Sequence, residues 1–388
     1  MRSESNSEFQ IPNSEFQRGV RVLLAAEGSG GHLIPALEVS RALVASGAQV
    51  CLLYAKRRQT AGLVEALMRE ATSAGVHVHP VCVSSAWHRI ARGPWRVWQA
   101  ATVWRLAHRY ARAFDPQAVV GFGGWFSIPI ALMARQRHTP LLLHEQNVYL
   151  GRANRLLVKW ADQLALSFEN GLTGERNIVI TGLPVREAIG TVGRQEAARR
   201  LGLNPDANTV LILGGSQGAQ PINRLVCQMV VELPDRARTS WQFIHLSGAS
   251  DDTLVQQVYA TVGVRAFVAA HLTDMGFAYA LADVVIARAG ASTIAELARC
   301  GIPAVLIPYP YAGGHQGANA RLVESVGGGV LVEEATATPQ QLFSLLHQIL
   351  SDERLRLKMA DQMRTLATPD ATTRLAHSIL NLCKRNTG

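Results

Sequence analysis

Residues 20–32 read VRVLLAAEGSGGH, a short apolar run that passes directly into a glycine-rich turn. A run of Val, Leu and Ala of this length is typical of a strand that is buried on both faces of a sheet. The glycines allow backbone N–H groups to approach an anion, and the N-terminus of the predicted next helix, with Pro35 near its start, favours negative charge. The stretch therefore predicts a strand–loop–helix unit suited to binding phosphate.

The alternation of strand and helix continues along the chain. Further strand-like runs lie at 48–54, 118–122 and 140–144, and after about residue 185 the series restarts at 209–214, 241–246, 283–287 and 303–308. Two such series predict an α/β protein with two Rossmann-like, doubly wound parallel-sheet domains facing a cleft. The predicted parts are a disordered extension at 1–17, a first domain at 18–184, a second domain at 185–366, and a C-terminal helix at 367–388 that packs back on the first domain.

Composition limits the class of protein. The chain has 388 residues, of which 48% are hydrophobic and 17% charged, enough for two sizeable cores. Its five cysteines form no CxxC pair, which predicts neither a disulfide framework nor a zinc site and is typical of a reducing compartment. The net charge of +9 and the pI near 9.7 indicate an anionic partner, whether nucleotide phosphate, anionic lipid or nucleic acid.

Residues 1–17 do not have the composition of a signal peptide, and stretch 116–134 does not have that of a transmembrane helix. Residues 1–17 are polar, repeat NSEFQ and lack the apolar core of a signal peptide. Stretch 116–134 carries no charge and is long enough to span a bilayer, but its prolines and glycines predict a strand, a glycine loop and a helix. We therefore predict no transmembrane segment.

Glycine turns follow three further strands, as GFGGW at 121–125, GGSQG at 214–218 and RAGAST at 288–293. A dinucleotide site would need glycine at Leu33 and an acid at the end of the next strand, which reads YAK at 54–56. NAD(P) binding is therefore disfavoured. The chain also has no Walker lysine motif and no Asp-x-Asp, so we expect no metal and no cofactor, with helix ends and side chains holding the phosphates.

Seven motifs in a fixed order resemble the MurG family. They are GSGGHLIPAL (28–37), GFGGW (121–125), LLHEQN (142–147), GLPVR (182–186), LGGSQGAQPIN (213–223), RAGASTIAE (288–296) and HQGANA (315–320). The resemblance runs from Val20 to Glu334 and implies a GT-B glycosyltransferase. It implies inverting transfer of GlcNAc from UDP-GlcNAc to the muramyl 4-hydroxyl of undecaprenyl-linked lipid I in peptidoglycan synthesis. It also implies a peripheral protein on the cytoplasmic face of the bacterial inner membrane.

The same resemblance implies which residues act. His32 matches the proposed catalytic base, Glu296 the acceptor of the ribose hydroxyls, and Leu272 a backbone contact to uracil. The implied donor contacts are Ser29, Gly30, Gly31, Asn147, Arg186, Ser216, Leu272, Ala291, Ser292, Thr293, Ile294, Ala295, Glu296, Gln316 and Asn319. The chain departs from the family pattern at Glu27, where glycine is usual, at Ser29, where threonine is usual, and at Gly314, where an acid is common.

Several of these residues also have purely structural interpretations. Thr293-x-x-Glu296 has the spacing of a capping box, in which both side chains bond the start of a helix. His144-Glu145 is either a catalytic pair or a buried ion pair, and Arg288 is either a phosphate clamp or an ordinary charge. His32 at a helix N-terminus is favoured as a base because the helix dipole disfavours the imidazolium.

A basic face with tryptophans is predicted on a helix at 95–113. The helical period places Val97, Trp104 and Ala107 on its core side, with His108 as a packed histidine. The opposite side carries Trp95, Trp98, Arg105, Arg109 and Arg112. This face suits an anionic bilayer surface, and the alternative is arginine stacking on tryptophan in water. No nucleic-acid-binding motif accompanies it, so we expect no nucleic-acid partner.

Rival functions remain open on the sequence. Another GT-B enzyme of UDP-sugars, such as a lipid galactosyltransferase or a UDP-GlcNAc 2-epimerase, has similar glycine turns. An epimerase would need neither a lipid acceptor nor the basic tryptophan face. A non-catalytic nucleotide-sugar sensor would keep Glu296 and Ser216 but tolerate the loss of His32.

Overall fold

The computed structural model describes residues 19–28, 30–56, 61–83, 94–169, 177–214, 218–311 and 313–385. The predicted disordered extension at 1–17 lies outside these residues. The chain forms two compact units: one contains the residues up to His144, 152–164 and those from Ala376 onward, and the other contains 145–151 and 165–375. Two parallel sheets confirm the predicted α/β fold.

The first sheet has seven strands in the order β3-β2-β1-β4-β5-β6-β7. They are β1 (Arg21–Glu27), β2 (Gln49–Lys56), β3 (His77–Cys82), β4 (Ala118–Gly121), β5 (Leu141–Glu145), β6 (Gln163–Leu166) and β7 (Ile178–Ile180). β1 pairs in parallel with β2 on one side and β4 on the other, so the strand order reverses direction between β1 and β4. Open α/β sheets bind ligands at such a switch point, outside the carboxyl ends of the strands.

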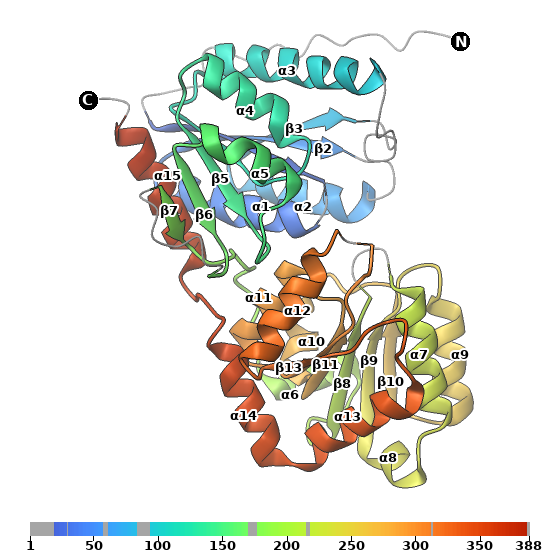
Figure 1. Ribbon diagram of the computed structural model, residues 1–388. Coiled ribbons are helices and arrows are strands. Elements are labelled where there is room, and N and C mark those ends of the chain that lie inside the picture. The colour runs from blue at the N-terminus through green and yellow to red at the C-terminus, as the bar shows by residue number, and fades with distance from the viewer. Residues whose placement is uncertain are drawn as a thin grey trace. The chain divides into compact units, whose positions relative to one another are not determined.

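Helices cover both faces of this sheet, with α1 and α2 on one face and α3 and α4 on the other (Figure 1). They are α1 (Gly30–Ala45), α2 (Ala61–Ser73), α3 (Pro94–Phe114), α4 (Ser127–Gln136) and α5 (Arg152–Leu157), which runs into a 3-10 turn (Val158–Trp160). From Ala376 onward the C-terminal helix α15 (Ala371–Arg385) belongs to the first unit, where the Ser378 hydroxyl donates to Gln163 Oε1 at 2.8 Å.

The second sheet has six strands in the order β10-β9-β8-β11-β12-β13. They are β8 (Asn208–Leu213), β9 (Trp241–Leu246), β10 (Ala266–Ala269), β11 (Val284–Ala287), β12 (Ala304–Leu306) and β13 (Gly329–Leu331). The helices are α6 (Arg194–Leu201), α7 (Gln220–Val231), α8 (Asp235–Ser240), α9 (Asp252–Val262), α10 (Met275–Leu281), α11 (Ala291–Cys300), α12 (His315–Ser325), α13 (Pro339–Ser351) and α14 (Glu353–Arg364).

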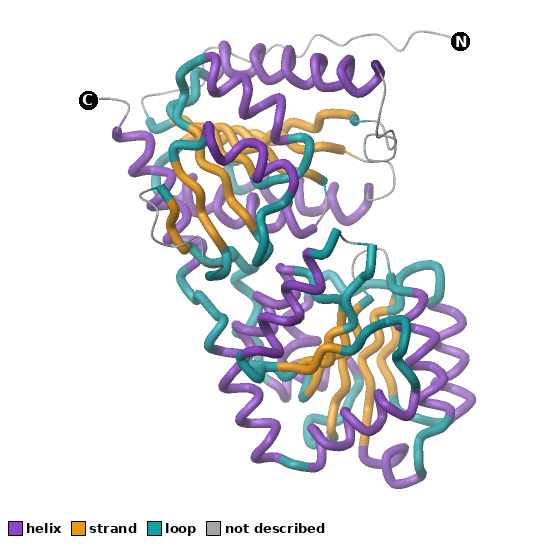
Figure 2. The backbone as a smooth tube through the Cα atoms, viewed as in Figure 1, coloured by secondary structure: helices purple, strands orange, loops and turns teal. Residues whose placement is uncertain are grey.

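Alternation along the strands builds a core on each face of the second sheet, which lies between layers of helices in Figure 2. In β8, Leu211 and Leu213 pack with side chains of α6, α10, α11 and α12. Val210 and Ile212 point the other way and pack with α7, α9 and α13. Successive side chains of a strand point to opposite faces, so one strand supplies both cores.

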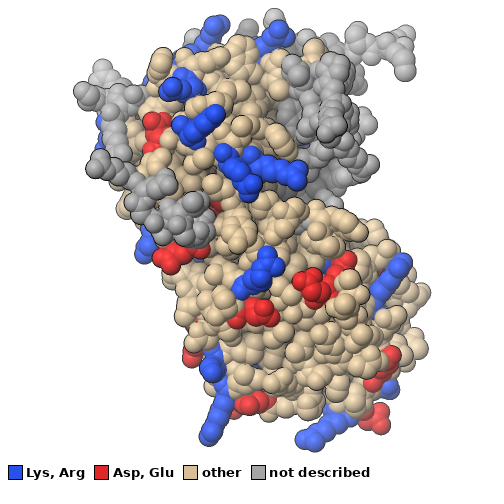
Figure 3. Space-filling model, in the orientation of Figure 1, with Lys and Arg blue, Asp and Glu red and all other residues tan. Residues whose placement is uncertain are grey.

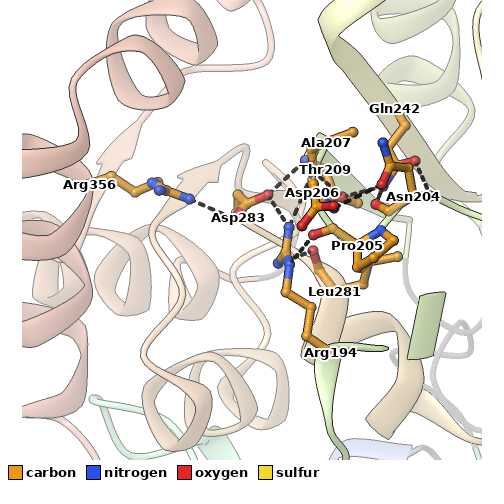
Figure 4. Close-up of polar contacts among 10 residues, drawn as sticks. All are labelled: Arg194, Asn204, Pro205, Asp206, Ala207, Thr209, Gln242, Leu281, Asp283 and Arg356. Atoms are coloured by element: carbon orange, nitrogen blue, oxygen red, sulfur yellow. Dashed lines mark hydrogen bonds and ion pairs between the residues drawn. The ribbon is translucent and has the colours of Figure 1, made fainter. Parts of the chain in front are cut away.

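Polar contacts close the amino-terminal edge of the second sheet (Figure 4). Asp283, just before β11, accepts hydrogen bonds from Thr209 N at 2.8 Å and Arg194 Nη2 at 2.9 Å. Arg356 pairs with the other oxygen of the same carboxylate at 2.5 Å. Arg194 also donates to main-chain carbonyls of Pro205, Ala207 and Leu281, which are labelled in Figure 4. Arginine side chains of α6 and α14 therefore bind the strand ends at this edge together.

A buried histidine lies between β9 and its covering helices. His245 is fully buried, with Nδ1 3.2 Å from the Tyr259 hydroxyl and Nε2 3.1 Å from Asn223 Oδ1. Burial lowers the pKa of His245 from 6.5 to about 3, although the charge of Asp251 opposes the shift. His245 is therefore neutral in the folded protein at physiological pH.

The neutral state of His245 makes stability depend on pH. Its pKa is lower in the folded chain than in the unfolded chain, so the proton binds on unfolding. The stabilisation is complete above about pH 6.5 and is lost as the pH falls toward 3, with a slope of up to about 1.4 kcal/mol per pH unit. In urea unfolding at pH 7.5, 6 and 5, the free energy of unfolding of His245→Gln should fall less with decreasing pH than that of the wild type. The exposed-site control His347→Gln should keep the wild-type slope, and equal slopes in all three proteins would refute the assignment.

Candidate functional site

The N-terminus of α11 is open at the carboxyl end of β11. Gly290 is the N-cap residue, and no side chain caps this helix. The Ser292 hydroxyl oxygen is buried and has no hydrogen-bond partner among the described residues. Thr293 is the third residue of the helix, so the capping-box interpretation of Thr293 and Glu296 is wrong. Free N–H groups and a buried hydroxyl without a partner suit an anionic ligand.

Glu296 faces inward from the same helix. It is 7% exposed, and Tyr279 of α10 donates its hydroxyl hydrogen to Glu296 Oε2 at 2.7 Å. Burial raises the pKa of Glu296, while the Tyr279 hydrogen bond and the charge of Arg186 lower it. The result is a carboxylate held in place by one neighbour, with Oε1 bonded by none of the described residues. Such an oxygen can accept hydrogen bonds from ligand hydroxyls.

Arg186 belongs to the segment that enters the second unit. Its Nη1 donates to Thr273 O at 3.2 Å, and its Nε is buried without a partner among the described residues. The bond ties Arg186 to the loop after β10, where half-buried Leu272 precedes Thr273. Arg186 therefore brings positive charge close to Glu296, and its Nε has a vacant hydrogen bond.

Asn319 of α12 joins two loops of the second unit. Its side chain is fully buried and donates to Ala289 O and Asn147 Oδ1, each at 3.1 Å. Its Oδ1 accepts from Val148 N, also at 3.1 Å. Asn319 therefore positions the turn before α11 and the loop after β5.

Glu145 holds that second loop from inside. Its carboxylate accepts from Asn147 N at 3.0 Å, Asn147 Nδ2 at 3.1 Å and Gly151 N at 2.8 Å. His144, one residue earlier, packs its ring 5.3 Å from that of Phe122. Glu145 therefore caps the loop after β5 from inside.

The loop between β12 and α12 is fixed at both ends. Gln316 Oε1 accepts from Tyr309 N at 2.8 Å. Arg288 donates to Ile307 O, pairs with Glu334 and lies 5.5 Å above the Tyr309 ring, so it supports this loop. His315, the first residue of α12, has a buried Nδ1 without a partner among the described residues.

In the first unit, His32 lies at the switch point between β1 and β4. It is the third residue of α1 and is half-buried. A Cβ on Gly123 (φ +79°) would lie 3.5 Å from the His32 ring, and one on Gly124 (φ +74°) would overlap Glu27 at 2.4 Å. The positive φ of both residues favours glycine, and at Gly124 the close approach of Glu27 leaves no room for a Cβ. Glu27 is a buried acid, 5% exposed.

The structure does not place every predicted residue. Ser29 and Ser216 lie outside the described residues, as does the side chain of Trp95. Arg186, Leu272, Asn147, Gln316, Asn319 and the segment Ala291–Glu296 all lie in the second unit, whereas Gly30, Gly31 and His32 lie in the first. Tyr279 was missed because an isolated Tyr carries no spacing signal, and His315 was not singled out within its motif HQGANA. Among the described residues, no three His, Cys, Asp or Glu side chains are grouped as a metal site requires.

The basic face predicted on α3 is exposed. Trp98 is 57% exposed, and Arg105, Arg109 and Arg112 are exposed beside it. Val103, Ala107 and Ala111 are buried beneath, and half-buried His108 has Nδ1 3.1 Å from Trp104 O. Figure 3 shows basic side chains over α3 and α5. None of the helices described has both the length and the apolar character needed to cross a membrane.

Family profiles match both halves of the chain. The Glycosyltransferase family 28 N-terminal domain matches residues 22–166, and the Glycosyltransferase family 28 C-terminal domain matches residues 209–375. With two parallel Rossmann-like sheets, these matches define a glycosyltransferase of the GT-B class. The catalytic class predicted from the sequence is confirmed.

Relatives specify the family. Proteins from Desulforamulus reducens (31% identical, covering 94% of this chain and 100% of the relative) and Chromohalobacter salexigens (38%, 92% and 95%) share one name. That name is UDP-N-acetylglucosamine–N-acetylmuramyl-(pentapeptide) pyrophosphoryl-undecaprenol N-acetylglucosamine transferase. The crystal structure of Acinetobacter baumannii MurG is similar, with a TM-score of 0.73, 28% identity and coverage of 94% of this chain and 100% of that chain. The chain belongs to the MurG family.

Enzymes of other activities share the fold. The UDP-GlcNAc 2-epimerase from Neisseria meningitidis, solved with UDP-GlcNAc bound, has a TM-score of 0.67 at 11% identity. It covers 93% of this chain and 100% of its own. At that identity the likeness concerns the fold alone.

Proposed function

We propose that this chain transfers GlcNAc from UDP-GlcNAc to the muramyl sugar of undecaprenyl-linked lipid I, forming lipid II. The observation that carries the proposal is the match across more than nine-tenths of the chain to relatives named for this transfer. The carboxyl edge of the second sheet supports it, because hydrogen-bonding groups suited to a nucleotide-sugar gather there.

In this proposal the second unit binds the donor. The diphosphate lies at the N-terminus of α11, where Ser292 Oγ has a vacant hydrogen bond, and Arg186 is proposed to contact it through its vacant Nε. The ribose hydroxyls donate to Glu296, and the uracil meets the backbone at Leu272. The sugar meets Asn147 and Gln316, with Asn319 positioning them. Ser29, Gly30, Gly31 and Ser216 are proposed as further donor contacts.

The proposed reaction is a single displacement at the anomeric carbon. The 4-hydroxyl oxygen of the muramyl sugar forms the new bond as the bond to UDP breaks, so the α linkage becomes β. His32 accepts the hydroxyl proton, and the departing diphosphate takes its bonding pair to the positive end of α11. Arg186 adds positive charge there, so the step needs no metal in this proposal.

We also propose that the exposed face of α3 contacts an anionic membrane surface. Trp98 is 57% exposed beside three exposed arginines, and interfacial surfaces combine aromatic rings with basic side chains in this way. The polyprenyl acceptor resides in a membrane, so this contact would bring the enzyme to its substrate.

An assay of UDP release tests the proposed function. With UDP-GlcNAc and a short-chain lipid I analogue, the protein should release UDP and form the β-linked disaccharide at equal rates with and without EDTA. UDP release that is just as fast without the analogue would indicate an epimerase or hydrolase. Absence of turnover despite donor binding would indicate a sensor, and inhibition by EDTA would contradict the metal-free displacement.

His32→Ala should lose at least about a hundredfold in kcat, because general-base catalysis contributes roughly 10² to 10⁴ in rate. The KM for UDP-GlcNAc should stay within a few-fold, which separates loss of a base from loss of a donor contact. His77→Ala, which removes an exposed histidine of the same sheet, should keep wild-type kcat. A raised donor KM with nearly intact kcat would remove His32 from the chemistry.

Vesicles of phosphatidylglycerol and phosphatidylcholine should bind the protein more tightly than pure phosphatidylcholine, and less so as salt rises. Trp98→Ala combined with glutamine at Arg105, Arg109 and Arg112 should weaken binding by at least about tenfold. A control with glutamine at Arg199, Arg200 and Arg236, exposed arginines of the second unit, removes the same charge and should bind normally. Equal weakening of vesicle binding in both variants would show that binding depends on net charge and not on the face of α3.

A further inference from the structure

The carboxylate of Glu296 has one hydrogen-bond donor among the described residues, the hydroxyl of Tyr279 at 2.7 Å. Tyr279 is 3% exposed and Glu296 is 7% exposed, so water has little access to the pair. Burial raises the pKa of Tyr279 well above 10, and the negative charge of Glu296 raises it further. The phenol therefore stays protonated and donates its hydrogen to the Glu296 carboxylate.

The bond divides the carboxylate into two different oxygens. Oε2 is occupied by Tyr279, whereas none of the described residues donates to Oε1. A free carboxylate rotates about its last torsion, which is broad, and presents either oxygen. One fixed hydrogen bond removes that freedom and turns Oε1 into an acceptor with a set direction.

Close packing fixes the position of Tyr279 as well. Its ring lies in the core that α10 shares with α6 and α11. A Cβ on Gly276, one turn earlier in α10, would lie 2.8 Å from Ala188 O, so glycine lets this helix approach the segment that carries Arg186. Tyr279 and Arg186, which both act on Glu296, thus belong to two segments that pack tightly against each other.

We propose that Tyr279 is a positioning residue that fixes Glu296 and so makes the site selective for a ribose over a deoxyribose in the nucleotide. The inference rests on the proposed role of Glu296 in donor binding. A buried acceptor that loses its partner hydroxyl is left unpaired, and sites of this kind reject ligands lacking the hydroxyl strongly. Without Tyr279 the carboxylate can turn away, so the missing hydroxyl matters less.

Calorimetric binding of UDP, 2′-deoxy-UDP and 3′-deoxy-UDP tests the proposal. The wild type should bind UDP at least about tenfold more tightly than one of the deoxy analogues, a difference of about 1.4 kcal/mol. Tyr279→Phe keeps the ring and removes the hydroxyl. It should weaken UDP binding by roughly five- to thirtyfold and reduce the discrimination to less than about threefold, with deoxy binding little changed. In turnover, the KM for UDP-GlcNAc should rise while kcat stays within about threefold.

Two further variants separate the role of Tyr279 from that of the ribose site itself. Tyr259→Phe removes another buried phenol of the second unit, the one 3.2 Å from His245, and should keep full discrimination. Glu296→Gln keeps an acceptor for Tyr279 but loses the charge, and should lose discrimination. Full discrimination in Tyr279→Phe, with loss in Glu296→Gln, would overturn the role of Tyr279 and leave the ribose site standing. Full discrimination in both variants would overturn the inference and the ribose assignment together, while the transfer assay tests the overall reaction separately.

Discussion

The side-chain amide of Asn319 is the interaction on which the candidate donor site depends. It is fully buried and bonds Ala289, Asn147 and Val148, so both groups of the amide are satisfied inside the second unit. A buried amide that lost these partners would leave several polar groups unpaired, at about 1–3 kcal/mol each. The turn before α11 and the loop after β5 are therefore held in one arrangement before any ligand arrives. Binding then has less ordering entropy to overcome.

The charges around this fixed frame match the parts of a nucleotide-sugar. The open N-terminus of α11 offers positive potential where a diphosphate is proposed. The buried carboxylate of Glu296 lies further along the same helix, where the proposed ligand presents neutral hydroxyls. Arg186 moderates the cost of burying that carboxylate, since its charge lowers the pKa of Glu296. One arginine thus serves the proposed phosphate site and the proposed ribose site.

Sequence patterns predicted the fold well where strands are long and apolar, and less well elsewhere. All eight strand-like runs correspond to strands, but β3, β6, β7, β10 and β13 were not identified. β3 contains Pro80 and two histidines, and β7 and β13 have only three residues, so their burial depends on neighbouring strands. The order of the motifs singled out Glu296 and Arg186 as candidate donor contacts. The hydrogen bond from Tyr279 to Glu296 and the capping of a loop by Glu145 depend on three-dimensional contacts that no motif encodes. The capping-box interpretation was wrong because helix α11 begins at Ala291, two residues before Thr293.

The central claim is that the carboxyl edge of the second sheet is a preformed UDP-GlcNAc site. A crystal structure of the protein with UDP-GlcNAc bound tests this most directly. The ribose hydroxyls should lie within hydrogen-bond distance of Glu296 Oε1, and the diphosphate should lie at Ser292 and the N-terminus of α11, with Tyr279 still bonded to Oε2. Ribose density away from Glu296, or a nucleotide bound elsewhere on the second unit, would contradict it.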